Sequence, residues 1–258
     1  MIITPPRYLK RKPTGSVRVL DPAIRGAWLY FNKSNLVYGQ KPILTNGSVR
    51  GNGNLITQSG DESAQLELNT EDRLWPHFKP FTWFIRLKLL PSPNSTQFDI
   101  FGNINLSATN YVRIFCKSNG SNYSIRTDIS VGSLTLVGSY IVPFDEIFNI
   151  VLTKSDDGAY SLHAIGEITS GSEGTEAEIY NRHGSRYHRI TEGGNAFTEI
   201  ESLYISHRHT SDNEVKELSR DPYSLFRSSH ELPSFVESIV ASGPNTPIFM
   251  HHLNQQRK

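Results

Sequence analysis

Alternation of apolar and polar residues runs through most of the chain and predicts β-strands. The clearest case is FTWFIRLKL, residues 81–89, in which every second residue is apolar and Thr82, Arg86 and Lys88 occupy the other side. A period of two residues is that of a strand with one buried face. Phe84 is an exception, since it is an aromatic residue on the polar side. We therefore predict a half-buried strand over residues 81–89.

Two further stretches each predict a pair of antiparallel strands joined by a short turn. Residues 111–129 place two apolar-rich runs on either side of Ser118-Asn119-Gly120-Ser121. Residues 148–165 repeat this arrangement around Asp156-Asp157-Gly158. Such turn residues between alternating runs are typical of β-hairpins.

The remaining strands and the absence of a long helical pattern indicate the fold class. Residues 134–142 and 201–209 predict additional strands, and no helical pattern long enough to cover a sheet lies between Ala23 and Thr210. A chain of 258 residues can form one large β-sandwich. We predict an all-β protein, a two-sheet antiparallel jelly-roll sandwich with one short C-terminal helix and extended termini.

The helical pattern appears only in SDNEVKELSRDPYSLFR, residues 211–227. Ser211 and Glu214 have the spacing of a capping box, and Asp221-Pro222 is expected to end the helix. The apolar side chains of the segment carry enough surface to hold it on the sandwich. We expect it to lie as a clasp across an open end of the two sheets. These apolar residues are Val215, Leu218, Tyr223, Leu225 and Phe226.

The same segment, together with the strand before it, resembles the end of concanavalin A-like, laminin-G-like jelly-roll domains of the kind found in bacteriophage virion proteins. Those domains end in a core strand, an LS-x-x-E-[IV]-x-x-L helix and a DP[WY]-x-LF tail; Thr210 departs from the leucine of that pattern. A looser similarity covers the opening G-x-W-x-F strand, the LTNG turn and the central strand, so that the resemblance spans about residues 23–227. The matching positions of the closing segment are Ser211, Glu214, Val215, Leu218, Asp221, Pro222, Tyr223, Leu225 and Phe226.

The resemblance implies the fold more strongly than the function, because this fold carries lectins, glycosidases, adhesive modules and virion parts. The retaining glycosidases of the family carry an E-x-D-x-x-E strand, which this chain lacks. Glu199 and Glu201 share a strand face, but no third acidic partner accompanies them. Catalysis by two carboxylates is therefore not expected, and we predict a protein that is not an enzyme.

Composition narrows the range of partners. The apolar fraction is 37%, the charged fraction 20% and the net charge +1, which argues for a folded protein without nucleic acid as a partner. Cys116 is the only cysteine, so no intramolecular disulfide can form, and we expect a buried thiol. Residues 1–15 lack the apolar core of a signal peptide and no run is long enough for membrane insertion. We expect synthesis in a host cytoplasm.

The two ends of the chain differ from the middle and predict docking elements. Residues 1–20 form a basic, proline-containing arm, residues 21–227 the jelly-roll domain and residues 228–258 a tail with unpartnered apolar residues. We expect both ends to dock on neighbouring subunits. The alternatives are a frayed arm and a tail that packs on its own domain. The docking candidates are Arg7, Tyr8, Lys10, Arg11 and Lys12 in the arm, and Ile248, Phe249, Met250 and Leu253 in the tail.

Other binding chemistry has weaker candidates. Trp75, together with the loop that holds Arg182, Arg186 and Tyr187, has the composition of a glycan-binding surface, although packed corners share that composition. No metal site or cofactor is expected. The residues closest to such a site are His207 and His209, and for calcium the carboxylates of Asp61, Glu62, Asp156 and Asp157.

These features together favour a structural protein of a bacteriophage particle. We predict a non-enzymatic capsid decoration or cement protein on the virion exterior, a homo-oligomer that binds other virion proteins through its ends. The alternative is a module of a tail fibre or tail tip that binds host surface carbohydrate.

Overall fold

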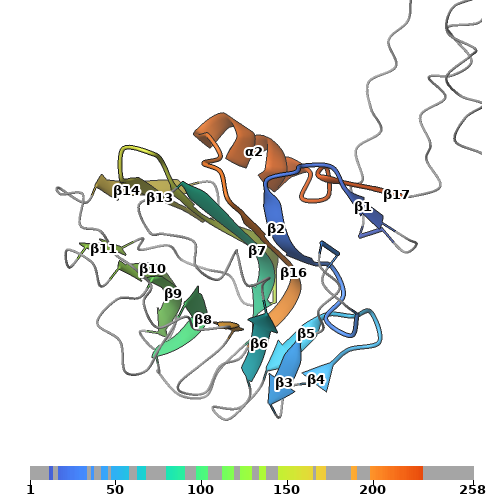
Figure 1. Ribbon diagram of the computed structural model, residues 1–258. Helices are drawn as coiled ribbons and strands as arrows, with labels where there is room; N and C mark the ends of the chain where they lie inside the picture. Colours follow the sequence, from blue (N-terminus) through green and yellow to red (C-terminus); the bar gives the residue numbers. More distant parts are fainter. Residues whose placement is uncertain are drawn as a thin grey trace, which may run out of the picture.

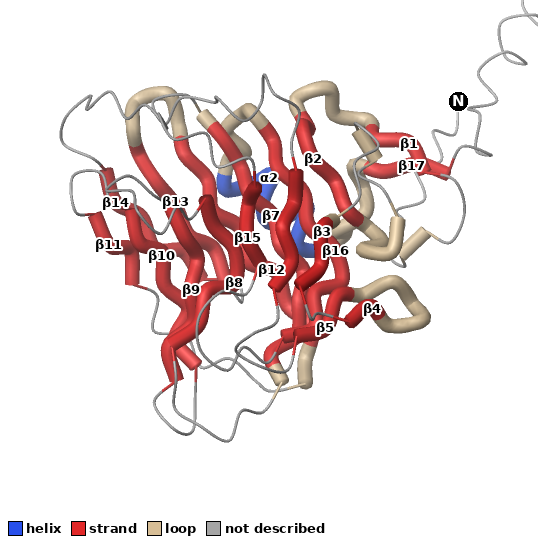
Figure 2. The backbone as a smooth tube through the Cα atoms, turned by 60° about the horizontal axis from the view of Figure 1, so that its bottom comes forward, coloured by secondary structure: helices blue, strands red, loops and turns tan. Residues whose placement is uncertain are grey.

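The computed structural model describes a β-sandwich whose strands lie in two facing layers (Figures 1 and 2). Within the residues that the structure describes, no helix is long and apolar enough to cross a membrane. The described residues are 12–13, 17–33, 36–37, 42–45, 48–57, 63–67, 80–90, 97–103, 112–118, 123–129, 134–137, 145–164, 167–172, 187–190 and 198–228.

All strand pairs in the two sheets are antiparallel, as predicted. The seven-stranded sheet has the order β11 (Leu134–Val137), β10 (Tyr123–Ile129), β9 (Val112–Ser118), β8 (Gln97–Asn103), β15 (Tyr187–Ile190), β6 (Ser63–Glu67) and β3 (Ile43–Thr45). The eight-stranded sheet has the order β14 (Glu167–Ser172), β13 (Ala159–Ala164), β12 (Ile147–Lys154), β7 (Phe81–Leu89), β16 (Thr198–Ser206), β5 (Leu55–Thr57) and β4 (Ser48–Val49), with β2 (Ile24–Trp28) also paired to β16.

Both predicted hairpins are present and the main core lies between the sheets. β9 pairs with β10, and β12 pairs with β13 around a turn in which Gly158 has a φ of 84°. The inward residues of β7 pack against the opposite sheet, where Trp83 and Phe101 meet edge to face at 4.9 Å between ring centroids. The Cys116 thiol is buried as expected, and burial raises its pKa well above the ordinary value.

A second apolar cluster on the outer face of the eight-stranded sheet explains the aromatic exception on β7. Phe84 is paired with Val151 of β12 and with Tyr204 of β16, and its ring stacks on that of Tyr204 at 4.5 Å. Helix α2 (Asp212–Arg220) covers this row with Val215 and Leu218. The clasp therefore lies on the outer face and not across an open end of the sandwich, because the apolar row that it buries points outward.

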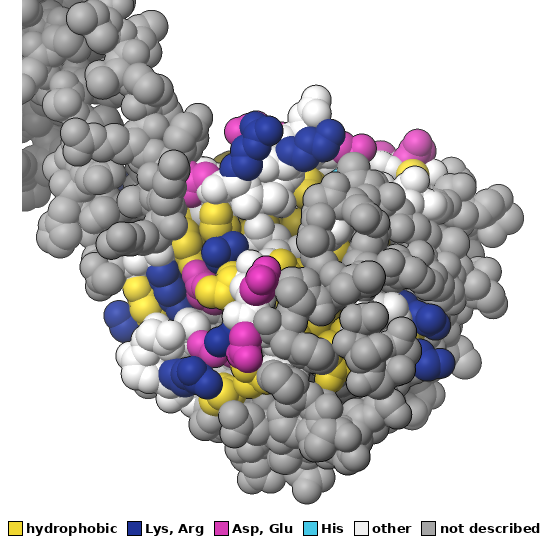
Figure 3. Space-filling model, turned by 180° about the vertical axis from the view of Figure 1, so that it is seen from behind, with side chains coloured by type: hydrophobic (Ala, Val, Ile, Leu, Met, Phe, Trp, Pro, Cys, Tyr) yellow, Lys and Arg dark blue, Asp and Glu magenta, His cyan; other side chains and the backbone are white. Residues whose placement is uncertain are grey.

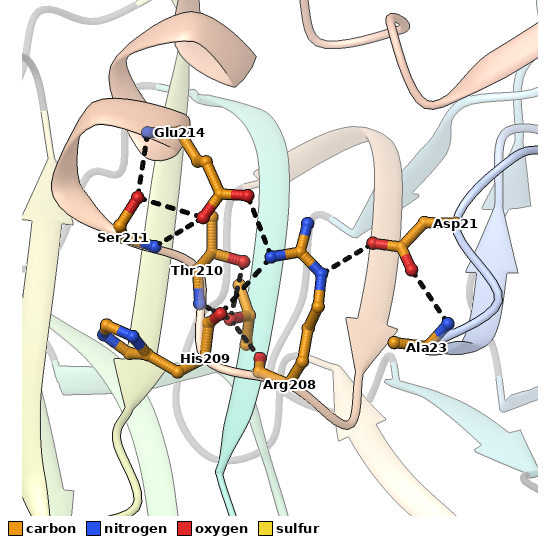
Figure 4. A network of polar contacts seen from close by, with 8 residues as sticks. Asp21, Ala23, Arg208, His209, Thr210, Ser211 and Glu214 are labelled. Atoms are coloured by element: carbon orange, nitrogen blue, oxygen red, sulfur yellow. Dashed lines mark hydrogen bonds and ion pairs between the residues drawn. The ribbon is translucent and has the colours of Figure 1, made fainter.

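Polar contacts fix the start of α2 (Figure 4). Glu214 accepts from the Ser211 backbone N–H at 2.9 Å, and Ser211 Oγ accepts from the Glu214 backbone N–H at 3.4 Å, which confirms the capping box. Arg208 joins Glu214 at 3.0 Å to Asp21 at 2.8 Å. Thr210 is buried and exchanges hydrogen bonds with the Thr82 hydroxyl. The Thr210 hydroxyl thus adds a contact between the helix start and β7 that the family's leucine lacks, whereas the hydrogen bond from the backbone N–H would also be open to leucine.

A two-stranded ribbon lies beside α2 and joins distant parts of the chain (Figure 1). β1 (Val17–Val19) pairs with β17 (Phe226–Ser228), and the Leu20 backbone N–H donates to the Leu225 carbonyl at 2.9 Å. Residues 17–19 of the predicted arm are therefore a strand. This pairing places the segment before the sandwich directly against the segment that closes it.

We expect Phe84→Ala to lower the free energy of unfolding by about 3 to 5 kcal/mol, because the change opens a cavity in the cluster under α2. Phe84→Leu, which keeps most of the apolar volume, should cost clearly less. Urea unfolding followed by circular dichroism measures both. Equal losses in the two variants would contradict a packed second cluster.

Candidate functional site

The outer face of the eight-stranded sheet is divided into rows by the pairing of its central strands. The apolar row of Val151, Phe84 and Tyr204 lies under α2, whereas the rows toward the other end of β7 are polar. Arg86 lies opposite Asn149, and Lys88 lies opposite Glu199. The polar rows are therefore the part of this face on which a ligand site can be built.

A cleft of about 280 Å³ lies at these polar rows. Basic and acidic side chains are interspersed over one face of the molecule (Figure 3). The cleft combines ammonium, amide and carboxylate groups with one apolar side chain. It is lined by Lys12, Asn52, Asn54, Lys88, Ile147, Glu199 and Glu201.

A β-bulge in β16 lies at the cleft. Ile200 is paired with Leu87 and Ser202 with Arg86, so Glu201 is an extra residue without a counterpart on β7. On the opposite edge of β16, β5 pairs up to Ile200 and β2 begins only at position 203. The Glu201 carbonyl between them accepts a hydrogen bond from Lys12 Nζ at 2.9 Å. Where the pairing of β16 is interrupted, a side chain from the N-terminal segment thus donates a hydrogen bond to the backbone of the strand.

Glu199 is the most buried carboxylate of the cleft, with 6% of its surface exposed. Asn54 Nδ2 donates to one of its oxygens at 2.8 Å, while Lys88 and Arg50 lie 3.3 and 3.4 Å from the other. Burial alone would raise the pKa of Glu199, but these hydrogen bonds and charges outweigh it, and its pKa lies below the ordinary value. Glu199 is therefore an ionised acceptor at neutral pH.

Lys12 forms a second fixed group of the cleft wall. Its Nζ donates to Asn54 Oδ1 at 2.8 Å as well as to the Glu201 carbonyl, and it lies 4.5 Å from the centre of the Tyr30 ring. Burial lowers the pKa of Lys12 to about 8, even though the negative charges of Glu201 and Glu199 act in the opposite direction. Asn54 therefore links the ammonium to the buried carboxylate through its two amide atoms.

The rim of the cleft is held by a glycine turn and by two further ion pairs. Gly53 has a φ of 83°, and a Cβ there would lie 2.4 Å from a Tyr30 ring carbon, so only glycine fits between Asn52 and Asn54. Arg86 lies 3.3 Å from Glu201, and Lys88 lies 3.7 Å from Asp145. Ile147 is 48% exposed and supplies an apolar contact surface at the edge.

The structure places only some of the predicted site residues. Lys12 lies in the cleft of its own chain, and Tyr187 begins β15, opposite Glu67. Docking on neighbouring subunits and glycan contact by the 182–187 loop stay predictions. The other candidates, outside the described residues, are Arg7, Tyr8, Lys10, Arg11, Trp75, Arg182, Arg186, Ile248, Phe249, Met250 and Leu253.

The weak metal candidates do not form a cluster with other ligands. His207 is half-buried and His209 exposed, and no three His, Cys, Asp or Glu side chains of the described ranges are grouped to hold a metal ion. Asp157 accepts from the Ala159 backbone N–H at 3.3 Å and contacts the Ser155 hydroxyl, which are the roles of a turn aspartate. Asp61 and Glu62 lie outside the described residues.

Sequence reasoning noted the two glutamates of the cleft, but only as a carboxylate pair that was not expected to be catalytic, and it missed their partners. The i, i+2 spacing in TEIE identified Glu199 and Glu201, and the cleft contains both. Asn52, Asn54 and Lys88 carry no motif that links them to this strand. The polar side of the 81–89 alternation does mark Lys88, but its place opposite Glu199 depends on strand pairing.

No protein-family model and no curated protein matches the sequence. Solved structures do match the fold. The binding domain of botulinum neurotoxin DC in complex with rat synaptotagmin II has a TM-score of 0.60 and 13% identity, over 77% of this chain and 51% of that one. The same domain in complex with SialylT has a TM-score of 0.57 and 12% identity, over 76% and 51%. A third structure, described by the statement that cell entry of botulinum neurotoxin type C depends on interaction with two ganglioside molecules, has a TM-score of 0.60 and 11% identity. The match covers 77% of this chain and 51% of that one.

These similarities establish the architecture of the chain. The described strands share the β-sandwich of the toxin binding domains, in agreement with the predicted jelly roll. This chain spans about half the length of those structures, and identities of 11 to 13% carry the fold alone. Two of the named neighbours are toxin binding domains and the third is a botulinum neurotoxin type C structure, and none of the three is a phage protein.

The burial of Lys12 gives a pH prediction. Below pH 8 its proton is bound in both states, and the cost of burying the ammonium is fully present. Between about pH 8 and 10.5 only the unfolded chain keeps the proton, so stability should rise with pH relative to a Lys12→Met variant, by on the order of 1 to 3 kcal/mol. Urea unfolding of both proteins at pH 7.5, 9 and 10.5 measures this difference. A pH-independent difference would contradict the burial.

Proposed function

We propose that this protein is a carbohydrate-binding module and that the cleft on the outer face of the eight-stranded sheet is its binding site. The observation that carries the proposal is the set of fixed polar groups in the cleft wall, which includes Lys12, Asn54 and Glu199 joined by hydrogen bonds. Sugar hydroxyls both donate and accept hydrogen bonds, so a wall that offers amide, carboxylate and ammonium groups side by side can bind them.

The dimensions and rigidity of the cleft agree with a small saccharide. Ligand pockets begin at about 300 Å³, so a cleft of about 280 Å³ lies at the small end of that range and favours a small ligand. The wall groups come from strands and from a turn fixed by Gly53, and their mutual hydrogen bonds hold them in place before a ligand arrives. Ile147 at the rim can contact the apolar C–H face of a sugar ring.

The structural neighbours support this reading as far as their descriptions go. One is a toxin binding domain in complex with SialylT, and another is a botulinum neurotoxin type C structure whose description says that cell entry depends on interaction with two ganglioside molecules. They favour the tail-fibre or tail-tip alternative over a capsid decoration protein. A module on a phage tail that binds host surface carbohydrate is our proposal for the setting, supported by the resemblance of residues 199–227 to phage jelly-roll domains. The capsid role stays a prediction that rests on the ends of the chain.

Binding without turnover fits the state of the carboxylates better than catalysis. Glu199 is ionised and paired with Lys88 and Arg50, and Arg86 lies 3.3 Å from Glu201. A glycosidase requires one carboxyl group that gives up a proton to the leaving oxygen. The low pKa of Glu199 makes it unsuitable as that donor. We therefore propose a non-enzymatic role.

A glycan array followed by calorimetry on the bound glycans tests the proposal. We expect binding to weaken about tenfold or more in Glu199→Gln and in Asn52→Ala, since each removes a polar group from the wall. Glu217→Gln on the exposed side of α2 is the control and should bind like the unchanged protein. Circular dichroism checks that each variant is folded.

Two outcomes would overturn the proposal. Failure of the full-length protein to bind any glycan of the array would exclude carbohydrate as the ligand, and unchanged affinity in both cleft variants would place the site elsewhere. Turnover of a bound glycan that disappears in Glu201→Gln would show an enzyme.

A further inference from the structure

The distribution of charge around the cleft distinguishes Lys12 from the other basic residues. Arg50 and Lys88 pair with Glu199, Lys88 also with Asp145, and Arg86 with Glu201. Lys12 instead donates to two neutral oxygens, the Asn54 amide and the Glu201 carbonyl. Among the described residues, each carboxylate of the cleft therefore forms an ion pair with an arginine or with Lys88. The ammonium of Lys12 has no carboxylate of these residues within ion-pair distance.

The surroundings of Lys12 add to this positive excess. The Nζ atoms of Lys12 and Lys33 lie 4.5 and 4.8 Å from the centre of the Tyr30 ring. The acidic groups that act on Lys12 from β16 are Glu201 and Glu199, both already held by arginine or lysine. A buried ammonium gains most from an ionic partner, because burial removes the water that otherwise solvates it.

From this arrangement we infer that the ligand of the cleft is a saccharide that carries a carboxylate, and that Lys12 is the residue that selects it. The inference rests on the proposed carbohydrate-binding function. A carboxylate beside Lys12 would complete the charge balance of the wall, and the third N–H of the ammonium provides a charge-assisted hydrogen bond. A neutral sugar can occupy the same space but cannot compensate the charge.

The inference makes the affinity depend on pH in a defined direction. Because burial lowers the pKa of Lys12 to about 8, the ammonium is present at pH 7 and is lost as the pH rises above 8. Uronic and sialic acids stay ionised throughout this range. Affinity for an acidic saccharide should therefore fall between pH 7 and 9.5, whereas affinity for a neutral saccharide has no such cause to change.

The experiment compares matched acidic and neutral ligands on the full-length protein. Glycans bound on the array are retested by calorimetry together with sialyllactose against lactose and cellobiouronic acid against cellobiose, at pH 7 and 9.5. We expect the acidic member to bind at least tenfold more tightly at pH 7, with most of this preference lost at pH 9.5.

Two substitutions separate charge selection from a structural role of Lys12. Lys12→Met should remove the preference for the acidic ligand, because it weakens the binding of the acidic member more than that of its neutral counterpart. Lys12→Arg, which keeps its charge at all these pH values, should retain the preference at both pH 7 and 9.5. Lys216→Met on the exposed side of α2 controls for a change in overall charge. Circular dichroism checks folding of all three.

The outcomes distinguish this inference from the function on which it rests. Equal binding of acidic and neutral ligands, or a preference that survives Lys12→Met, would overturn the role of Lys12 but leave a carbohydrate-binding cleft. Loss of both ligand classes in a folded Lys12→Met variant would make Lys12 a structural part of the wall and not the selecting group. Binding of no saccharide at all would overturn both proposals.

Discussion

The pairing of β7 with β12 on one side and β16 on the other is the constraint on which the rest of the structure depends. It aligns Phe84 with Val151 and Tyr204, and Lys88 with Glu199, on the outer face of the same sheet. Because side chains alternate strictly along a strand, a slip of one residue would send the charged row into the core. The main core between the sheets therefore fixes, at the same time, which residues the outer face presents.

The outer face of the eight-stranded sheet then has two separate parts, an apolar row that is covered by α2 and polar rows that form the cleft. Its apolar row needs a cover, and α2 supplies one through Val215 and Leu218, anchored at its start by the capping box and by Arg208. The polar rows are better left in contact with water or with a polar ligand, since removing charged groups from water is costly. The end of α2 reaches only as far as Asn149, which donates to the Ser219 carbonyl. The cleft begins beyond that contact.

Within the cleft, a defect of the sheet and a residue from far away in the sequence complement each other. The bulge at Glu201 leaves a carbonyl between the ends of β5 and β2, and Lys12, 189 positions earlier, donates to it. The same ammonium is then held by Asn54, which also binds Glu199. Stability and recognition are linked here, because the group that completes the strand edge is also the cation that a ligand would meet.

The sequence by itself determined the local structure, and the tertiary structure determined the site. Strand periodicity, turn residues and the Ser211–Glu214 spacing act over a few residues, so the hairpins and the helix cap were predictable. The outward role of Phe84 and the contact of Lys12 with Glu201 were not, because each depends on partners more than 60 residues away. The spacing in TEIE pointed to two acidic groups, but only strand pairing and the bulge brought Lys12, Asn54 and Lys88 to them.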